Sequence, residues 1–224
     1  MTIDSIMRRL RLLFGKVMVH SISQLKRKAG YEKLDLAKSI PGEEAIASLY
    51  QHYVTQYSRA DMAISFELAK SILNLCHTQL PRKTLDLGSG FSSWVFRKYA
   101  KENNATGWSV DDDPAWLEKT KKFLSENNLE TDHCIVLQDF IQSDETGFDM
   151  VLLDLNFVEV RKNYIQLAVE RCRKGGLVLF DDVHKADYRD DVLKLCWSLP
   201  IRLYDIRDYT LDKFARYTWL GIKY

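Results

Sequence analysis

The chain has few cysteines, no long apolar run and almost no net charge. Its four cysteines are far apart, and none forms the C-x-x-C pair of zinc and redox sites. We interpret them as small buried hydrophobic residues, which suits a reducing compartment. No apolar stretch approaches the roughly 20 residues that cross a bilayer, and Lys16 interrupts the one that would resemble a signal sequence. We therefore expect a soluble, cytoplasmic protein.

The net charge of +1 hides an asymmetry between the N-terminus and the rest of the chain. Residues 1–40 hold nine Lys or Arg against three Asp or Glu, a net +6, so residues 41–224 carry −5. Apolar residues recur at helical spacing through residues 3–17, which predicts a basic amphipathic helix. We expect residues 1–28 to contact the protein's own domain, a second subunit in a homo-oligomer, or an anionic membrane surface peripherally. We expect no nucleic-acid partner, because the remaining chain is acidic.

Composition predicts one folded domain with an extension. A hydrophobic content of 46% with 12% aromatic residues supplies a substantial core, which excludes a disordered protein. We place the basic helical extension at residues 1–40 and the domain at residues 41–224. Within the domain, residues 41–82 are predicted lead-in helices and residues 83–224 a sheet core. The sequence shows no internal repeat or low-complexity segment.

The glycine-containing segment at residues 84–93 is the most informative motif. A short apolar run ends at Gly88 and Gly90, and a helical pattern follows. In a parallel α/β sheet this order places a tight turn at the carboxyl end of a strand, where a backbone without Cβ atoms lets a ligand approach closely. A dinucleotide-binding fingerprint would have glycine in the place of Ser93, so the motif alone leaves the ligand open.

Carboxylates follow every later predicted parallel strand. The pairs of strand and carboxylate are residues 106–110 with Asp111, Asp112 and Asp113, residues 133–137 with Asp139, residues 148–153 with Asp154, and residues 177–180 with Asp181 and Asp182. The first of these groups lies roughly 20 residues after the glycine turn, where an acidic side chain meets ribose hydroxyls in nucleotide-binding folds. Nucleoside binding is the prediction.

The order of elements predicts an α/β fold with a doubly wound, mostly parallel, seven-stranded sheet. Helices are expected between the strands, including one from Pro114 to about residue 127 and one around residues 160–168 that ends at Gly175 and Gly176. The last two predicted strands, residues 201–208 and 214–222, are too close for a helical crossover. The final strand should therefore be antiparallel.

Residues 83–224 resemble the class I S-adenosylmethionine-dependent methyltransferases, which have a Rossmann-like fold. The resemblance rests on residues 85–90, 110–114, 148–154 and 175–182, which occur in the family's order and spacing. It implies cofactor contacts by Asp86, Gly88 and Gly90 at the methionine end, Asp111 at the ribose and Asp139 at the adenine amino group, with Ser89 and Asp112 in the same predicted site. Ionised carboxylates suit these hydroxyl, ammonium and amino donors. Asp112 could instead supply charge at the start of the next helix.

Three carboxylates, Asp154, Asp181 and Asp182, form a candidate reaction centre. Clusters of oxygen ligands suit Mg²⁺. Here the chain resembles catechol-type, cation-dependent O-methyltransferases, and the resemblance implies a metal site in which Asp182 replaces the family's asparagine. The chain departs from these enzymes again after Asp154, where it lacks their lysine. His184 is the candidate general base beside a catalytic Asp154, because histidine titrates near neutral pH. The alternative is that these residues only cap a helix and shape a polar surface loop.

We therefore expect an S-adenosylmethionine-dependent transferase that methylates a small-molecule hydroxyl on a sugar, a polyol or a phenol, with Mg²⁺ as an optional second cofactor. Two other functions stay open. One is an NAD-dependent oxidoreductase, disfavoured by Ser93 and by the antiparallel pair at the C-terminus. The other is an interaction protein that binds S-adenosylmethionine without transferring its methyl group.

Overall fold

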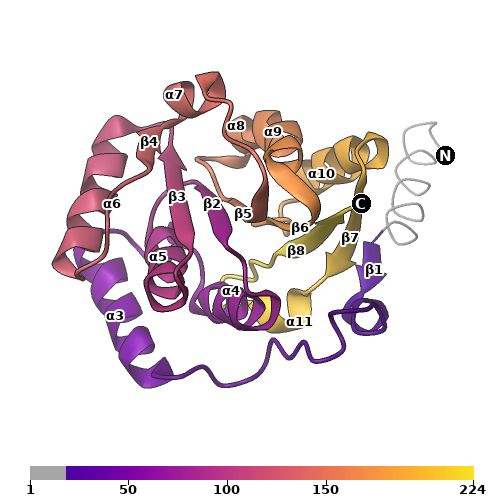
Figure 1. Ribbon diagram of the computed structural model, residues 1–224, viewed down its shortest axis with the longest axis horizontal. Helices are drawn as coiled ribbons and strands as arrows, with labels where there is room; N and C mark the ends of the chain where they lie inside the picture. Colours follow the sequence, from indigo (N-terminus) through magenta and orange to yellow (C-terminus); the bar gives the residue numbers. More distant parts are fainter. Residues whose placement is uncertain (1–18) are drawn as a thin grey trace.

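The computed structural model describes residues 19–224 (Figure 1). The helix predicted within residues 3–17 lies outside this range. The strands are β1 (Val19–Ser21), β2 (Lys83–Leu87), β3 (Thr106–Asp111), β4 (Cys134–Val136), β5 (Phe148–Leu153), β6 (Cys172–Phe180), β7 (Ile201–Asp205) and β8 (Trp219–Lys223). The helices are α2 (Ile22–Leu25), α3 (Glu43–Gln56), α4 (Phe66–Gln79), α5 (Phe91–Asn103), α6 (Pro114–Glu126), α7 (Leu137–Gln142), α8 (Val158–Arg161), the 3₁₀ helix η1 (Lys162–Tyr164), α9 (Ile165–Arg171), α10 (Ala186–Ser198) and α11 (Arg207–Thr210).

One sheet contains all the described strands, in the order β1-β7-β8-β6-β5-β2-β3-β4. Only β8 is antiparallel to its neighbours β6 and β7, so the prediction of a mostly parallel sheet with a reversed last strand is confirmed. Seven of the strands come from residues 83–224, as predicted. The eighth, β1, pairs in parallel with β7 and extends that edge of the sheet. The strand order reverses between β2 and β5, where ligands bind in folds of this kind.

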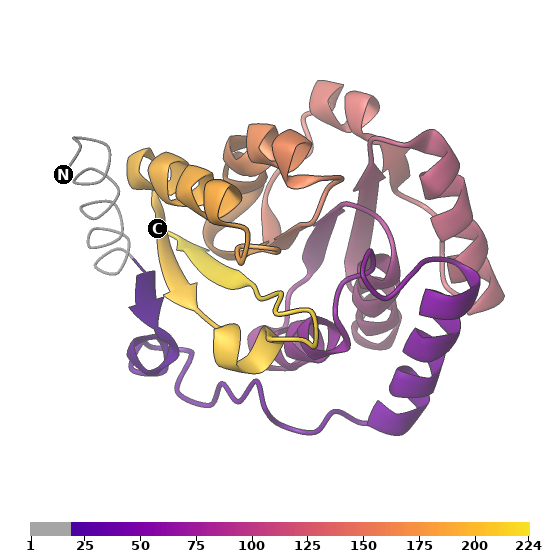
Figure 2. The same cartoon turned by 180° about the vertical axis from the view of Figure 1, so that it is seen from behind.

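Helices cover both faces of the sheet (Figures 1 and 2). Alternation along β5 shows why: Met150 and Leu152 belong to the core beneath α3–α6, whereas Val151 and Leu153 belong to the core beneath α7–α10. Successive side chains of a strand point to opposite faces, so an unbroken apolar strand buries residues in two cores. The central strands therefore form a rigid platform, and their carboxyl ends are fixed in position.

Residues 25–40 pack on the domain. Leu25, Leu34 and Leu36 are buried in the core, and the Asn74 amide of α4 donates to the carbonyl oxygens of Leu36 and Lys38 at 3.1 and 2.9 Å. In Figure 1 this segment runs past α11 and α4 to reach α3. The boundary that we predicted at residue 40 therefore does not separate two structural units among the described residues.

Three local features differ from the predicted elements. The strand predicted over residues 133–137 is shorter, because α7 starts at Leu137. Gly175 and Gly176 lie inside β6 instead of ending a helix. The short helix α11 occupies part of the link between β7 and β8. Across residues 19–224, no helix combines the length and apolar character that a membrane span needs.

Candidate functional site

The glycine turn after β2 packs directly on the end of β5. The Asp154 N–H donates to the Leu87 carbonyl at 2.7 Å. Gly88 has φ +112°, and a Cβ atom at this position would lie 2.4 Å from the carbonyl carbon and oxygen of Asp154. The φ angle favours glycine, because other residues rarely adopt this conformation. The close contact also requires glycine, because the Asp154 backbone cannot move aside to make room for a Cβ atom. The turn thus brings the ends of β2 and β5 together.

Hydrogen bonds from Ser89 fix the same turn to the end of β3. The backbone N–H and hydroxyl of Ser89 donate to Asp111 Oδ2 at 2.7 and 2.9 Å. The indole of Trp116 on α6 donates to the Ser89 carbonyl at 2.7 Å. Asp113 caps α6 by accepting from the backbone N–H groups of Ala115 and Trp116. Asp111 and Ser89 therefore lie side by side, as the prediction of one cofactor site required.

Asp86 is fully buried at the end of β2. Its Oδ2 accepts from the hydroxyls of Ser92 and Ser93 at 2.8 and 2.7 Å, while its Oδ1 is buried without a partner. Burial raises the pKa of Asp86 to about 7, despite the two serine hydrogen bonds. An unpaired buried carboxylate oxygen is costly unless a ligand completes it. Asp86 is not part of the lining of the cavity described below, so an ammonium donor, such as the amino group of S-adenosylmethionine, would reach Oδ1 only if the glycine turn moved to admit it.

A cavity of about 540 Å³ opens at the carboxyl ends of β2, β3 and β5. This volume lies within the range of small-molecule and cofactor sites. Its lining combines residues 88–92 and 111–113, Trp116 and Lys119 of α6, Asp154 and Asn156 after β5, and residues 53, 56–59 and 62–64 from α3 and the loop after it. The lining thus combines carboxylates, apolar surface and, at the glycines, backbone without side chains. These features together fit a ligand made of a nucleoside joined to an amino acid.

Tyr53 of α3, whose side chain is almost fully buried, brings to the cavity lining a hydroxyl that sequence reasoning missed. Its ring packs against Phe91 and Phe123, with centroids 5.5 and 4.7 Å apart. A Cβ atom on Gly90 would lie 3.1 Å from the Tyr53 hydroxyl, so this glycine leaves room for the tyrosine at the turn. Burial raises the pKa of Tyr53, which keeps the hydroxyl protonated and able to donate.

The carboxylates after β5 and β6 do meet, but a buried arginine lies between them. Arg161 Nη2 is 2.7 Å from Asp154 Oδ1, and Arg161 Nη1 is 3.3 Å from Asp182 Oδ2. Asp181 Oδ1 instead accepts from the Thr218 hydroxyl at 2.6 Å. Within residues 19–224, no three His, Cys, Asp or Glu side chains are arranged to hold a metal ion. The three predicted metal ligands therefore do not fit a divalent cation.

The pKa values of these carboxyl groups diverge because their surroundings differ. Burial raises the pKa of Asp154 well above its usual range, although Arg161 opposes the rise. Burial and repulsion from Asp182 raise the pKa of Asp181 to about 6. For Asp182, burial is outweighed by the attraction of Arg161, Lys185 and His184, which leaves its pKa below the ordinary value. Asp154 is the member of the group that lines the cavity.

His184, the predicted general base, lies beside Asp182. Its Nδ1 is 3.5 Å from Asp182 Oδ1, and its side chain is about one quarter exposed. Burial lowers the pKa of His184, with Asp182 opposing the change. Neither residue is part of the cavity lining. The structure therefore places His184, the sequence-based candidate for the general base, beside Asp182 and outside the cavity lining.

The other two predicted cofactor residues differ in position. Asp112 lines the cavity and accepts from the Asn156 amide at 2.6 Å, which links the loops after β3 and β5. Asp139 is exposed in the first turn of α7 and is not part of the lining. The resemblance implies an adenine contact for Asp139, whereas α7 starts at Leu137 and contains Asp139 in its first turn.

Comparison with known proteins agrees with this geometry. Residues 85–183 match a family model described as a methyltransferase domain. Three solved structures share the fold. The O-methyltransferase TomG from Streptomyces achromogenes, involved in tomaymycin synthesis and in complex with SAM, has a TM-score of 0.58 and 18% identity, covering 83% of this chain and 91% of that one. Methyltransferase PaMTH1 from Podospora anserina, bound to SAH, has a TM-score of 0.60 and 13% identity, covering 84% and 90%, and an O-methyltransferase from Bacillus cereus in complex with SAH has a TM-score of 0.58 and 12% identity, covering 83% and 91%. A search among curated proteins gave no match.

The matched segment contains the glycine turn, Asp111, Asp154 and Asp181, and the sheet has the order and reversed strand of the methyltransferase fold. The protein is an S-adenosylmethionine-dependent methyltransferase. This identification decides between the three functions that the sequence left open, and both the oxidoreductase and the interaction protein without turnover are set aside.

Proposed function

We propose that the protein methylates a hydroxyl group of a small molecule, and that the hydroxyl is phenolic. In this proposal the partnerless Oδ1 of Asp86 accepts from the cofactor's ammonium group, and Asp111 accepts from its ribose hydroxyls. Asp111 uses both carboxylate oxygens within the protein, yet an ionised carboxylate has about four acceptor positions. Gly88 and Gly90 keep the turn free of side chains where the cofactor would lie.

Asp154 is the residue that we propose as general base, and its position carries the proposal. It follows β5, touches the glycine turn through its backbone, and lines the cavity beside Asp111 and Asn156. Bound S-adenosylmethionine supplies an electrophilic methyl group on its sulfonium. Asp154 would take the proton from the acceptor hydroxyl as the oxygen attacks. A carboxylate whose pKa is raised toward the working pH is a stronger base than an ordinary aspartate.

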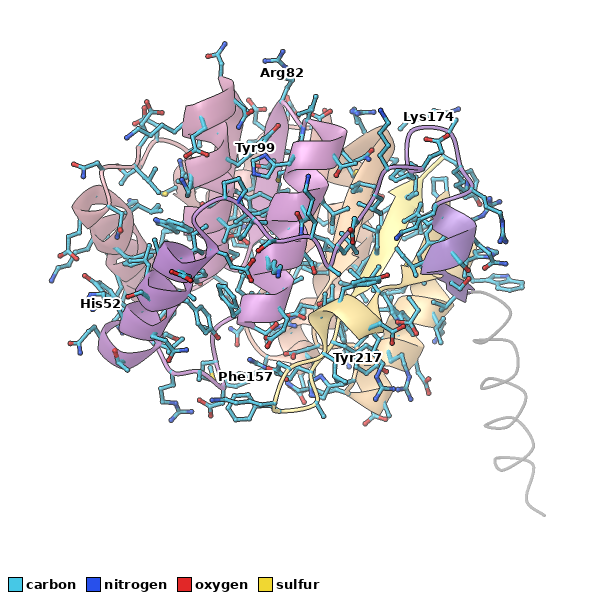
Figure 3. All side chains as sticks on the ribbon, turned by 90° about the horizontal axis from the view of Figure 1, so that it is seen from below. His52, Arg82, Tyr99, Phe157, Lys174 and Tyr217 are labelled. Carbon is cyan, nitrogen blue, oxygen red and sulfur yellow. The ribbon has the colours of Figure 1, made fainter. Side chains whose placement is uncertain are left out.

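Exposed apolar side chains near the cavity favour a phenol over a sugar or a polyol. Met62 lines the cavity and is about half exposed, while Phe157 follows the lining residue Asn156 and is 59% exposed. Phe214, also exposed, lies in a loop that Arg216 ties to the carbonyl of Ala63 at 2.9 Å. Phe157 points outward at the same end of the sheet as Tyr217 (Figure 3). Such a rim would bury an aromatic ring and would gain little from a sugar.

The test is a methyl-transfer assay with purified full-length protein, S-adenosylmethionine and a panel of acceptors. The panel pairs simple phenols and catechols with polyols and sugars, and mass spectrometry locates the added methyl group. We expect S-adenosylhomocysteine release that depends on the phenol, and a methyl group on oxygen. Transfer to nitrogen or carbon, or a preference for sugars, would contradict the proposal. Asp144→Asn, an exposed carboxyl after α7, is the matched control for variants of buried aspartates.

A further inference from the structure

Arg161 is an unusual residue for a surface helix, since it lies at the end of the four-residue α8 and is only 3% exposed. Its Nε donates to the Leu155 carbonyl at 3.2 Å, and Nη1 donates to the Asp181 carbonyl at 3.3 Å. Its Nη2 donates to the carbonyls of Asp154 and Asn156 at 3.1 and 2.8 Å. One guanidinium therefore joins the loops after β5 and β6.

The same guanidinium carries the charge compensation for the carboxylates. It pairs with Asp154 Oδ1 and Asp182 Oδ2, so two of the three predicted metal ligands already have a cationic partner. Lys185 reaches only Asp182, at 3.5 Å, and is 42% exposed. A divalent ion needs about six oxygen ligands. The guanidinium of Arg161 already lies between the ends of β5 and β6 and is bonded to the carboxylate and carbonyl oxygens that face it there. Its fixed positive charge would also repel a second cation.

The carbonyl contacts make Arg161 more than a counter-ion. Four backbone oxygens from two loops are held by a planar group that presents five N–H donors in a rigid fork. A hydrated metal ion would serve the same purpose with oxygen ligands. The Asp154 side chain is thus fixed at the cavity by the same residue that fixes the backbone on either side of it.

We propose that Arg161 takes the place of the divalent cation expected from the sequence, so that the enzyme transfers methyl groups without a metal and Arg161 acts as the positioning residue for Asp154. The inference rests on the proposed role of Asp154 as base. It replaces the metal hypothesis that the three strand-end carboxylates suggested. A misplacement of about 1 Å in a catalytic group can cost about 100-fold in rate, so loss of Arg161 should affect kcat far more than cofactor binding.

The first experiment uses the wild-type protein. Methyl transfer with the best phenolic acceptor is measured in excess EDTA and with added Mg²⁺ or Mn²⁺, and Mn²⁺ binding is followed by electron paramagnetic resonance without any acceptor. We expect the same rate throughout and no stoichiometric Mn²⁺ binding. A stoichiometric Mn²⁺ site that Asp154→Asn removes, or activity that EDTA abolishes and Mn²⁺ restores, would overturn the proposal.

The second experiment compares Arg161→Met and Arg161→Lys with Arg202→Met, a change at an exposed arginine of β7. We expect Arg161→Met to lower kcat about 100-fold while the KM for S-adenosylmethionine stays nearly constant. Arg161→Lys should recover part of kcat, because it keeps the charge and loses the fork. Equal kcat in all the variants would refute the positioning role. If Arg161→Met does not fold, the positioning role is judged from the kcat of Arg161→Lys and from Mn²⁺ binding by the wild-type protein.

The two proposals fail in different ways. A wrong function would show as absence of oxygen methylation by the wild-type protein, under any metal condition. A wrong role for Arg161 would show as Mn²⁺ binding by the wild-type protein, which needs no acceptor.

Discussion

Replacing Asp86 by asparagine tests the cofactor site through the pH dependence that a buried carboxyl group with a partnerless oxygen produces. The side chain keeps its shape, and its carbonyl oxygen can still accept from Ser92 and Ser93. The change removes the charge and places an NH₂ donor where Oδ1 now lies buried without a partner. It should therefore stabilise the protein without ligand and weaken the binding of S-adenosylhomocysteine.

The magnitude follows from the pKa of Asp86, which burial raises from 3.8 to about 7. The folded protein holds this proton at pH values where the unfolded chain has lost it, so the free energy of unfolding falls as pH rises from about 4 to about 7. The full difference corresponds to about 4 kcal/mol above pH 7. Asp86→Asn removes this cost. It should raise the free energy of unfolding by up to about 4 kcal/mol at pH 8 and by less than about 1 kcal/mol at pH 4.

Thermal denaturation of both proteins between pH 4 and pH 8 is the assay. For a domain of this size, 4 kcal/mol corresponds to roughly 10 °C in Tm at pH 8. Calorimetry with S-adenosylhomocysteine should show at least about tenfold weaker binding at pH 8, because a hydrogen bond to a charged group is lost. Parallel stability curves for Asp86→Asn and wild type would refute the reasoning about the buried carboxyl.

Four further outcomes are expected. Asp111→Ala should weaken S-adenosylhomocysteine binding about tenfold in calorimetry, and unchanged affinity would remove Asp111 from the ribose site. Gly88→Ala should lower the free energy of unfolding by about 1–3 kcal/mol in urea titrations, because its Cβ would meet the backbone after β5. His184→Ala should change kcat little, whereas loss of a general base costs about 100-fold or more. Deleting residues 1–40 should lower Tm much more than deleting residues 1–18, since the first deletion removes buried leucines of the core; equal melting would mean that their packing is dispensable.

The residues around the glycine turn could be predicted because each depends on local chain geometry. Gly88 and Gly90 mark a turn after an apolar run, and the carboxylates Asp111 and Asp154 follow apolar runs short enough to be strands. Parallel strands carry their ends to one edge, so proximity follows from order. The structure places all four at one cavity.

Arg161 could not be predicted, because its role depends on contacts that strand order does not specify. In the sequence it is one basic residue among many on an amphipathic segment, and such residues are usually exposed. Only the packing of α8 beneath the loops after β5 and β6 shows that it lies between Asp154 and Asp182. The metal prediction depended on the same contact: three clustered carboxylates favour a nearby cation, and a sequence pattern cannot say whether a side chain of the same chain supplies that charge.

The boundary predicted at residue 40 follows the basic charge of residues 1–40 and the Pro41-Gly42 pair, so it includes residues 19–40 in the extension. Charge patterning reports on the surface, whereas Leu25, Leu34 and Leu36 contribute through burial. The pairing of β1 with β7 depends on a contact between segments about 180 residues apart, and short edge strands carry little periodic signal.

The rate of methyl transfer in a single turnover, with Asp154→Asn compared with wild type, tests the central claim most directly. Both proteins are saturated with S-adenosylmethionine and a phenolic acceptor, and S-adenosylhomocysteine affinity is measured in parallel to confirm an intact cofactor site. If Asp154 takes the proton, the variant should bind S-adenosylhomocysteine normally and transfer the methyl group at least about 100-fold more slowly. Equal transfer rates with equal affinity would contradict the account, because Asp154 would then line the cavity without acting in the reaction.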